Sequence, residues 1–216
     1  MAGDDTPEGG GASPADAAAE RDRYFYALGR FVSVFSLVEG LVQALLWDLA
    51  GLENGVARAV LSGARMHEAQ GLIKRILEVK PFPKIDRGEL EDVFSQLAGI
   101  TRVRNDILHY GAVARAGDGY FASNEHVAHL PERLRETRVS PDVLEAMHED
   151  LAKMAIQIGG FFAAAQGVGP TGEGWEPFER ARRRAWLYRP DAPSRTGQPR
   201  PPKPPKRRPR PGSSQG

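Results

Sequence analysis

The residues best suited to chemistry lie in the segment TRVRNDILHYG, where Arg104, Asn105 and His109 form the pattern Arg-Asn-x3-His. A histidine exchanges protons near neutral pH, and the planar guanidinium of an arginine binds oxyanions. If the segment is helical, at about 100° per residue, Asn105 and His109 share one face, and Arg102 and Asp106 join it. The sequence therefore predicts a polar, titratable face at this point.

Arg104 is expected to point away from that face, into the apolar stripe of its own helix. The stripe is formed by Leu97, Ile100 and Ile107. A guanidinium in an apolar stripe is costly unless it is paired. Its stem either extends outward to water, or the charge meets an acid or an anion at an interface. Glu39 is a candidate acid for such a pair.

The spacing alone favours a structural role for these residues. An arginine and a histidine five residues apart are common by chance in helices. A histidine near the end of a helix also stabilises the helix dipole, as a cation does near any helix C-terminus.

The helical period dominates the chain and positions this motif. Apolar residues recur at steps of three and four, which predicts helices over 16–50, 55–79, 87–110 and 141–166. A break is expected in the second helix near Ser62-Gly63. Ser140 and Pro141 form a strong helix start. We therefore predict an all-α fold, an up-down four-helix bundle with a small β-hairpin insertion and disordered termini.

Two smaller elements are predicted outside the four helices. Two short runs around Gly117-Asp118-Gly119 indicate a hairpin at about 112–124, and residues 125–139 give no clear pattern. A short basic helix is expected at about 176–187. Its aromatic residues suit either an amphipathic helix docked on the bundle, which we favour, or a platform for stacking RNA bases.

The charge is concentrated at the two ends of the chain. The net charge is +1 over 216 residues, yet residues 189–216 contain eight bases and one acid among many prolines. We predict a disordered acidic segment at 1–15, one domain at 16–188 and a disordered basic tail at 189–216. The tail either attracts RNA phosphates or is inert. Its candidate RNA-binding residues are Arg200, Lys203, Lys206, Arg207, Arg208 and Arg210.

Composition excludes several classes of site. The chain has no cysteine, so it has no disulfide framework, thiol nucleophile or cysteine-ligated metal. His126 and His129 lack a third ligand at a suitable spacing, and no metal or cofactor is predicted. The apolar run at 31–52 is interrupted by Glu39 and Asp48. We interpret it as the core helix of a soluble cytoplasmic protein with no membrane partner.

The stretch RNDILHYG, at the end of the third long helix, resembles the Arg-x4–6-His motif of HEPN domains. These are small helical bundles found in prokaryotic toxin and defence systems and in some eukaryotic proteins. The resemblance covers about residues 20–167: a long first helix with an acid, a motif-bearing helix and a final long helix. The hairpin is not part of the minimal domain, and the proline-rich tail lies outside the resemblance.

The resemblance implies a metal-independent endoribonuclease that acts as a homodimer, of the kind that serves as a toxin or defence effector, with an unknown antitoxin or regulatory partner. Arg104 and His109 would be the catalytic pair of a pocket shared by two copies. Asn105 would orient them, with Glu39, Asp106 and Arg102 in support. The reaction would be attack of an RNA 2′-OH on its neighbouring phosphate. The alternative is a non-catalytic HEPN-like module that dimerises or binds RNA or another partner.

Overall fold

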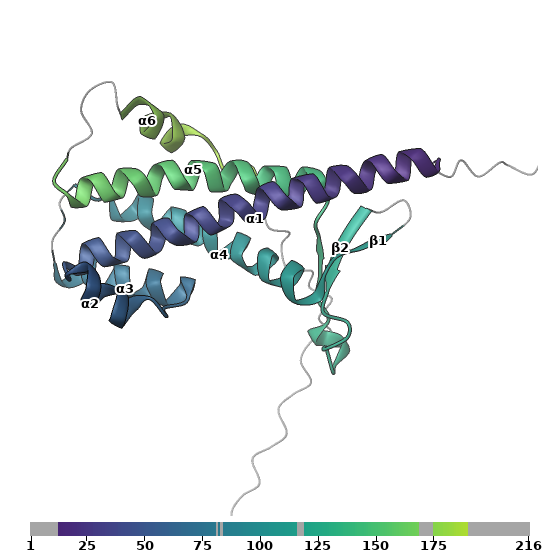
Figure 1. The fold of residues 1–216 in the computed structure, drawn as a ribbon, viewed down its shortest axis with the longest axis horizontal. Coiled ribbons are helices and arrows are strands. Elements are labelled where there is room, and N and C mark those ends of the chain that lie inside the picture. The colour runs from purple at the N-terminus through teal and green to yellow at the C-terminus, as the bar shows by residue number, and fades with distance from the viewer. Residues whose placement is uncertain (1–12, 81, 83, 116–118, 169–174, 190–216) are drawn as a thin grey trace, which may run out of the picture.

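The computed structural model describes residues 13–80, 82, 84–115, 119–168 and 175–189. In chain order its elements are α1 (Pro14–Ala50), α2 (Asn54–Leu61), α3 (Met66–Val79), α4 (Arg87–Tyr110), β1 (Val113–Arg115), β2 (Gly119–Ser123), the 3-10 turn η1 (Pro131–Arg133), β3 (Glu136–Arg138), α5 (Pro141–Ala165) and α6 (Glu176–Arg183). The described chain is mostly helical, with one small antiparallel sheet at one end (Figure 1).

The helix boundaries follow from local capping. α1 begins at Pro14, two residues before the expected start, because Ser13 and Asp16 form a reciprocal capping box. It ends at Gly51, whose φ of 66° is readily adopted only by glycine. The expected break in the second predicted helix is confirmed, since α2 ends at Leu61 and α3 begins at Met66.

The two longest helices, α1 and α5, run parallel to each other. The side-chain contacts between them include Arg23 with Asp142, Arg30 with His148, and Gln166 with Asp48. At each of these contacts the residue of α5 comes 118 or 119 positions after its partner on α1, so the two helices run in the same direction. A strictly up-down bundle would make the first and last helices antiparallel. The predicted up-down topology of the bundle is therefore not confirmed.

α4 packs against α5 in the opposite direction. Gln96 contacts Asp150, and Glu89, earlier on α4, contacts Gln157, later on α5. α4 is therefore antiparallel to both long helices, and its C-terminal end lies beside the sheet (Figure 1).

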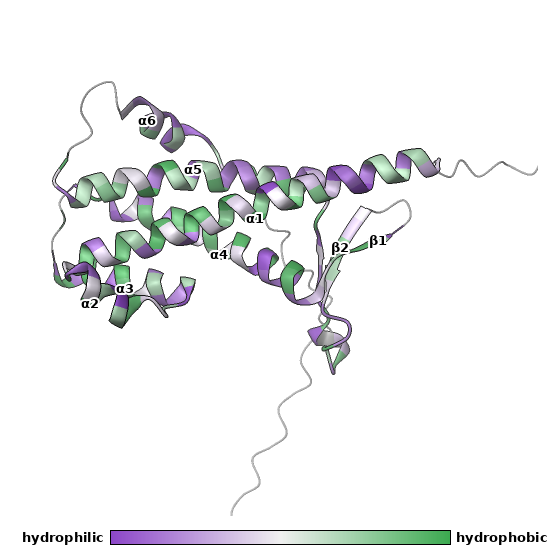
Figure 2. Cartoon of the chain, viewed as in Figure 1, coloured by the Kyte–Doolittle hydropathy of each residue, from purple (hydrophilic) through white to green (hydrophobic). Residues whose placement is uncertain are grey.

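The core lies between these helices. Its largest fully buried side chains include Phe31, Phe35, Leu45, Phe94, Leu97, Ile100, Leu144, Met147 and Phe161. They come from the apolar stripes of α1, α4 and α5, and each helix carries hydrophilic residues on its other side (Figure 2). Burial of these stripes is the main stabilising term of the fold.

The sheet has the strand order β1-β2-β3, with both pairings antiparallel. β1 and β2 confirm the predicted hairpin, with Val113 opposite Phe121; residues 116–118 of its turn lie outside the described residues. β3 comes from the segment that gave no clear pattern. The sheet is fixed to α1 by the rings of Tyr24 and Tyr120, which stack at 3.8 Å and 6°.

α6 is docked on the bundle, in agreement with the favoured interpretation. Phe178 is buried against α5 at Gly160, where an added Cβ would lie 2.0 Å from the ring. α6 ends at Arg183, earlier than the predicted 187, because the backbone N–H groups of Leu187 and Tyr188 donate to Asp150 instead of continuing a helix. The predictions for residues 1–12, and for the basic tail from 190 onward with its six named bases, lie outside the described residues.

Candidate functional site

The predicted motif occupies the last two turns of α4. The helix starts where the Asp86 carboxylate accepts hydrogen bonds from the N–H groups of Gly88 and Glu89, at 2.9 and 3.1 Å. Its apolar stripe is buried from Leu90 to Ile107. It stops at Gly111, whose φ is 71°. The stripe fixes the rotation of α4, and so it determines where each motif side chain points.

Arg104 packs on α1, as its place in the apolar stripe suggests. The guanidinium carbon lies 5.1 Å from the centre of the Phe35 ring. One terminal nitrogen is 3.8 Å from Oε2 of Glu39, and the other donates to Oδ1 of Asn105 at 3.1 Å. The Nε–H is buried and has no hydrogen-bond partner within the described part of the chain. The expected pairing of Arg104 with Glu39 therefore forms, but it leaves donors of the arginine unused.

His109 lies one turn further along and is exposed to solvent. Its ring centre is 6.3 Å from that of Tyr110. Neither ring nitrogen forms a hydrogen bond within the described residues, so both are accessible to a ligand or substrate. Because residues five apart on a helix differ by about 140°, Arg104 and His109 of one copy point in different directions.

Asp106 and Arg102 behave differently, although both were predicted on the face of His109. Arg102 is exposed. Asp106 is buried, with its side chain 9% exposed, and accepts from Arg135 at 3.5 Å and Thr137 at 3.4 Å. The segment carrying β3 covers this carboxylate, so the polar face is divided into an open part and a covered part.

Arg135 is a residue near the motif that sequence reasoning missed. Its guanidinium is about half exposed and adds a positive charge beside Asp106. Asn124 holds the backbone there: its amide donates to the Arg133 carbonyl at 3.0 Å and accepts from the Arg135 N–H at 2.6 Å. No periodicity marks this segment. The basic residues at 133, 135 and 138 were the only available signal.

A second polar cluster lies on α5, at the point where the C-terminal segment docks. Asp150, Lys153 and Gln157 are 1%, 4% and 3% exposed. Lys153 donates to the Arg184 carbonyl at 2.5 Å and lies 3.4 Å from the centre of the Trp186 ring. These side chains follow one another at steps of three and four inside an apolar helix, which is the signal that could have identified them.

Burial shifts the pKa of two charged groups at this docking point. It lowers the pKa of Lys153, although Asp150 and Asp92 act in the opposite direction. It also raises the pKa of Glu89, against a hydrogen bond from Gln157 and the charge of Arg182. Since nearly all of these groups contact the segment 182–188, we assign the cluster to holding that segment in place.

No set of three histidine, aspartate or glutamate side chains that could hold a metal ion occurs within the described ranges. His126 and His129 are both exposed. α1 is long and apolar enough to cross a membrane by length and composition, with a third of its most apolar window buried in the protein. No protein-family model, curated protein or solved structure matches the chain.

Proposed function

We propose that the chain is a metal-independent endoribonuclease of HEPN type, cytoplasmic and possessing a four-helix core of that family, in which Arg104 and His109 act on RNA. The observation that carries the proposal is that the end of α4 presents both an arginine held in place by its neighbours and a solvent-exposed histidine. Arg104 has a buried Nε–H without a partner, and His109 is exposed without one. A phosphate is a ligand that would satisfy such arginine donors.

The anchoring of Arg104 suits a role in charge stabilisation. Its planar group is held by Phe35, Asn105 and Glu39, so little side-chain entropy remains to be lost when a phosphate binds. A prepositioned donor that does not change protonation stabilises the charge that develops in a transition state.

The reaction begins when His109 accepts the proton of an RNA 2′-OH. The freed oxygen attacks the adjacent phosphorus, and the bond from phosphorus to the 5′-oxygen of the next nucleotide breaks. That oxygen takes up a proton from water, and His109 later releases to the solvent the proton that it accepted, so the products are a 2′,3′-cyclic phosphate and a 5′-OH. Arg104 neutralises charge on the non-bridging oxygens during the step. Proton and charge balance require no further reactant.

Two copies are needed because of the helical geometry. Arg104 and His109 of one copy diverge by about 140° on α4, so one phosphate is reached by an arginine of one copy and a histidine of the other. Arg102 and Arg135, both cationic and exposed near the motif, would hold the flanking phosphates of the RNA.

Cleavage of single-stranded RNA in the presence of EDTA tests the proposal. We expect the wild-type chain to cut the RNA and the His109→Ala variant to be slower by about 10²–10⁴-fold. His67→Ala is the matched control, because His67 is also exposed on a helix, and should retain wild-type activity. Equal rates for wild type and His109→Ala, or cleavage that EDTA abolishes, would contradict the proposal.

The alternative function is a non-catalytic HEPN-like module that dimerises or binds RNA or another partner. The Arg104–Glu39 contact of 3.8 Å favours it, because that ion pair gives the arginine a structural role without any substrate. RNA binding without cleavage in the same assay would support this alternative.

A further inference from the structure

The small sheet buries one of its faces and leaves the other open. On the inner face, Tyr120 of β2 stacks on Tyr24 of α1. Thr137 of β3 contacts Asp106 of α4 on the same face. Side chains alternate between the two faces along a strand, so the residues next to Tyr120 and Thr137 project away from the helices. The hairpin is not part of the minimal HEPN domain, and the proposed reaction uses none of its residues.

The register of the strands defines the outer face. Val113 of β1 and Arg138 of β3 lie directly opposite Phe121, one on each side of β2. Paired residues of antiparallel strands project from the same face, so these three side chains form one row. We call this row, together with the neighbouring side chains on the same face, the outer sheet face; its members are Val113, Arg115, Phe121, Ser123, Glu136 and Arg138.

Phe121 and Arg115 form a stacking platform on this face. The guanidinium carbon of Arg115 lies 4.9 Å from the centre of the Phe121 ring. Both terminal nitrogens of Arg115 also donate to the carboxylate of Glu136, one of them at 3.1 Å. Because the ring and the carboxylate hold the guanidinium in place, a ligand that stacks on it costs little side-chain entropy. The Arg115 side chain is 43% exposed, so the platform can be reached from solvent.

The charge of the face favours a polyanion that carries flat rings. Glu136 balances the charge of Arg115, whereas Arg138 is exposed and forms no ion pair within the described residues. Arginine binds phosphate through two parallel hydrogen bonds, and unstacked RNA bases lie on aromatic side chains and on arginine planes. An acidic peptide would contact Arg138 but would make no use of the Phe121 ring. Single-stranded nucleic acid therefore fits the face better than an acidic peptide does.

We propose that the outer sheet face binds single-stranded RNA, with one base stacked on the platform of Phe121 and Arg115 and a neighbouring phosphate on Arg138. β1 begins four residues after His109, so the start of the sheet lies within about 14 Å of that histidine. Single-stranded sites on other sheet proteins cover about 4–16 nucleotides, so a strand whose phosphate lies at His109 also reaches the sheet. The link to cleavage rests on the proposed function, whereas the binding is argued from the sheet alone.

The first experiment measures binding apart from cleavage. A 2′-O-methyl oligonucleotide lacks the 2′-OH that the proposed reaction requires, so it is bound without being cut. In fluorescence anisotropy, Phe121→Ala should weaken its binding by about 5–150-fold, which is the loss expected for one stacked base. Phe121→Trp should bind as tightly as the wild type. A strand of the same length without bases should bind to the wild type and to Phe121→Ala equally, because only its phosphates remain.

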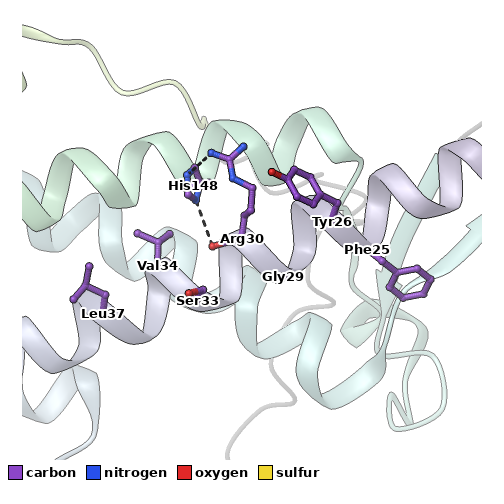
Figure 3. A pocket seen from close by; sticks show the side chains of 8 residues that line it. All are labelled: Phe25, Tyr26, Gly29, Arg30, Ser33, Val34, Leu37 and His148. Carbon is purple, nitrogen blue, oxygen red and sulfur yellow. Dashed lines mark hydrogen bonds between the residues drawn. The ribbon is translucent and has the colours of Figure 1, made fainter.

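The matched control is an exposed phenylalanine on another surface. Phe25 is 60% exposed in an apolar groove of about 620 Å3 along α1 (Figure 3). Arg30, which lines the same groove, is engaged by His148 at 2.8 Å and lies over the Tyr26 ring. The Phe25 ring is not stacked on a cation within the described residues, so Phe25→Ala should bind the methylated strand as the wild type does.

Arg138 is tested through the salt dependence of binding. Each phosphate contact on a single strand contributes about 0.7 to the logarithmic slope, so Arg138→Gln should flatten the slope by about that amount. Arg58→Gln is the control, since Arg58 is exposed on α2 at the other end of the bundle from the sheet (Figure 1). The basic tail is present in every variant, so its contribution to the slope is common to all of them.

Several results would overturn the proposal. They are equal binding of the methylated strand by the wild type and Phe121→Ala, an equal loss for strands with and without bases, and an unchanged salt slope in Arg138→Gln. A polyglutamate peptide that binds the wild type where RNA does not would assign the face to an acidic protein partner instead. Base-dependent binding at Phe121 without cleavage of unmodified RNA would keep the sheet site and refute the nuclease. Cleavage with unchanged binding in Phe121→Ala would do the opposite.

Discussion

At the scale of single residues, Arg104 and Asp150 differ in how many of their hydrogen-bonding atoms have a partner. Arg104 has one good hydrogen bond, one longer ion-pair contact and an unpaired Nε–H. Asp150, by contrast, accepts hydrogen bonds from Gln96, Leu187 and Tyr188 within 3.0 Å. A fully satisfied buried carboxylate is typical of a structural role. The unpaired donor beside an open histidine is what distinguishes the motif.

Tyr24 gives a prediction that depends on pH. Burial and the neighbouring Tyr120 raise the pKa of Tyr24 from 10.0 to about 12, so the folded state favours the neutral phenol. Its contribution to stability is complete below pH 10 and is lost as the pH rises toward 12. The urea-unfolding free energy of the wild type should therefore fall more steeply between pH 10 and 12 than that of Tyr24→Phe. Parallel curves would contradict this.

At the scale of elements, the helix spans and one helix break could be predicted from the sequence, because local periodicity and capping determine them. The spans 87–110 and 141–165 follow their apolar stripes and caps, and the break before Met66 follows Ser62-Gly63. Direction of packing was not predictable, because the parallel α1–α5 pair depends on contacts 118 residues apart. β3 was missed because three residues give no period and only their pairing with β2 makes them a strand.

Part of the candidate site could also be predicted from the sequence, and part could not. Asn105 and His109 could be placed from helical geometry, and the Arg104–Glu39 pair from the cost of an unpaired buried charge. The contacts of Arg135 and Thr137 with Asp106 could not be predicted, because they depend on where a non-periodic segment packs against α4.

The docking of α6 can be tested with two adjacent glycines. Gly160→Ala would put a Cβ 2.0 Å from the Phe178 ring and displace it, whereas Gly159→Ala meets no atom within 4 Å. Loss of the buried phenyl ring costs about 1.5–3 kcal/mol, so we expect residues 175–189 of Gly160→Ala to be cut faster in limited proteolysis. Gly159→Ala should gain about 0.5–1 kcal/mol of stability. Equal proteolysis of the two variants would show that Phe178 does not anchor α6.

At the scale of the whole molecule, charge is unevenly distributed along the sequence. Eight of the basic residues lie at 189–216, whereas the body is nearly neutral. If the tail attracts RNA phosphates, it supplies affinity and α4 supplies chemistry.

Truncation after Arg189 tests this division. We expect the shortened chain to bind single-stranded RNA more weakly and with a flatter dependence on salt, since each lost phosphate contact reduces the logarithmic slope by about 0.7. Cleavage at saturating RNA should remain. An unchanged slope would mark the tail as inert.

The central claim, a pocket shared by two copies, is tested most directly by mixing two inactive variants. Arg104→Ala and His109→Ala homodimers should each have lost nearly all cleavage while circular dichroism shows an intact helical fold. In a mixed dimer, one of the two pockets keeps His109 of the first chain and Arg104 of the second. We predict that RNA cleavage returns in proportion to the fraction of mixed dimers, up to about half the wild-type rate per dimer if the two pockets act independently. No recovery, with mixed dimers shown to form, would contradict the shared pocket.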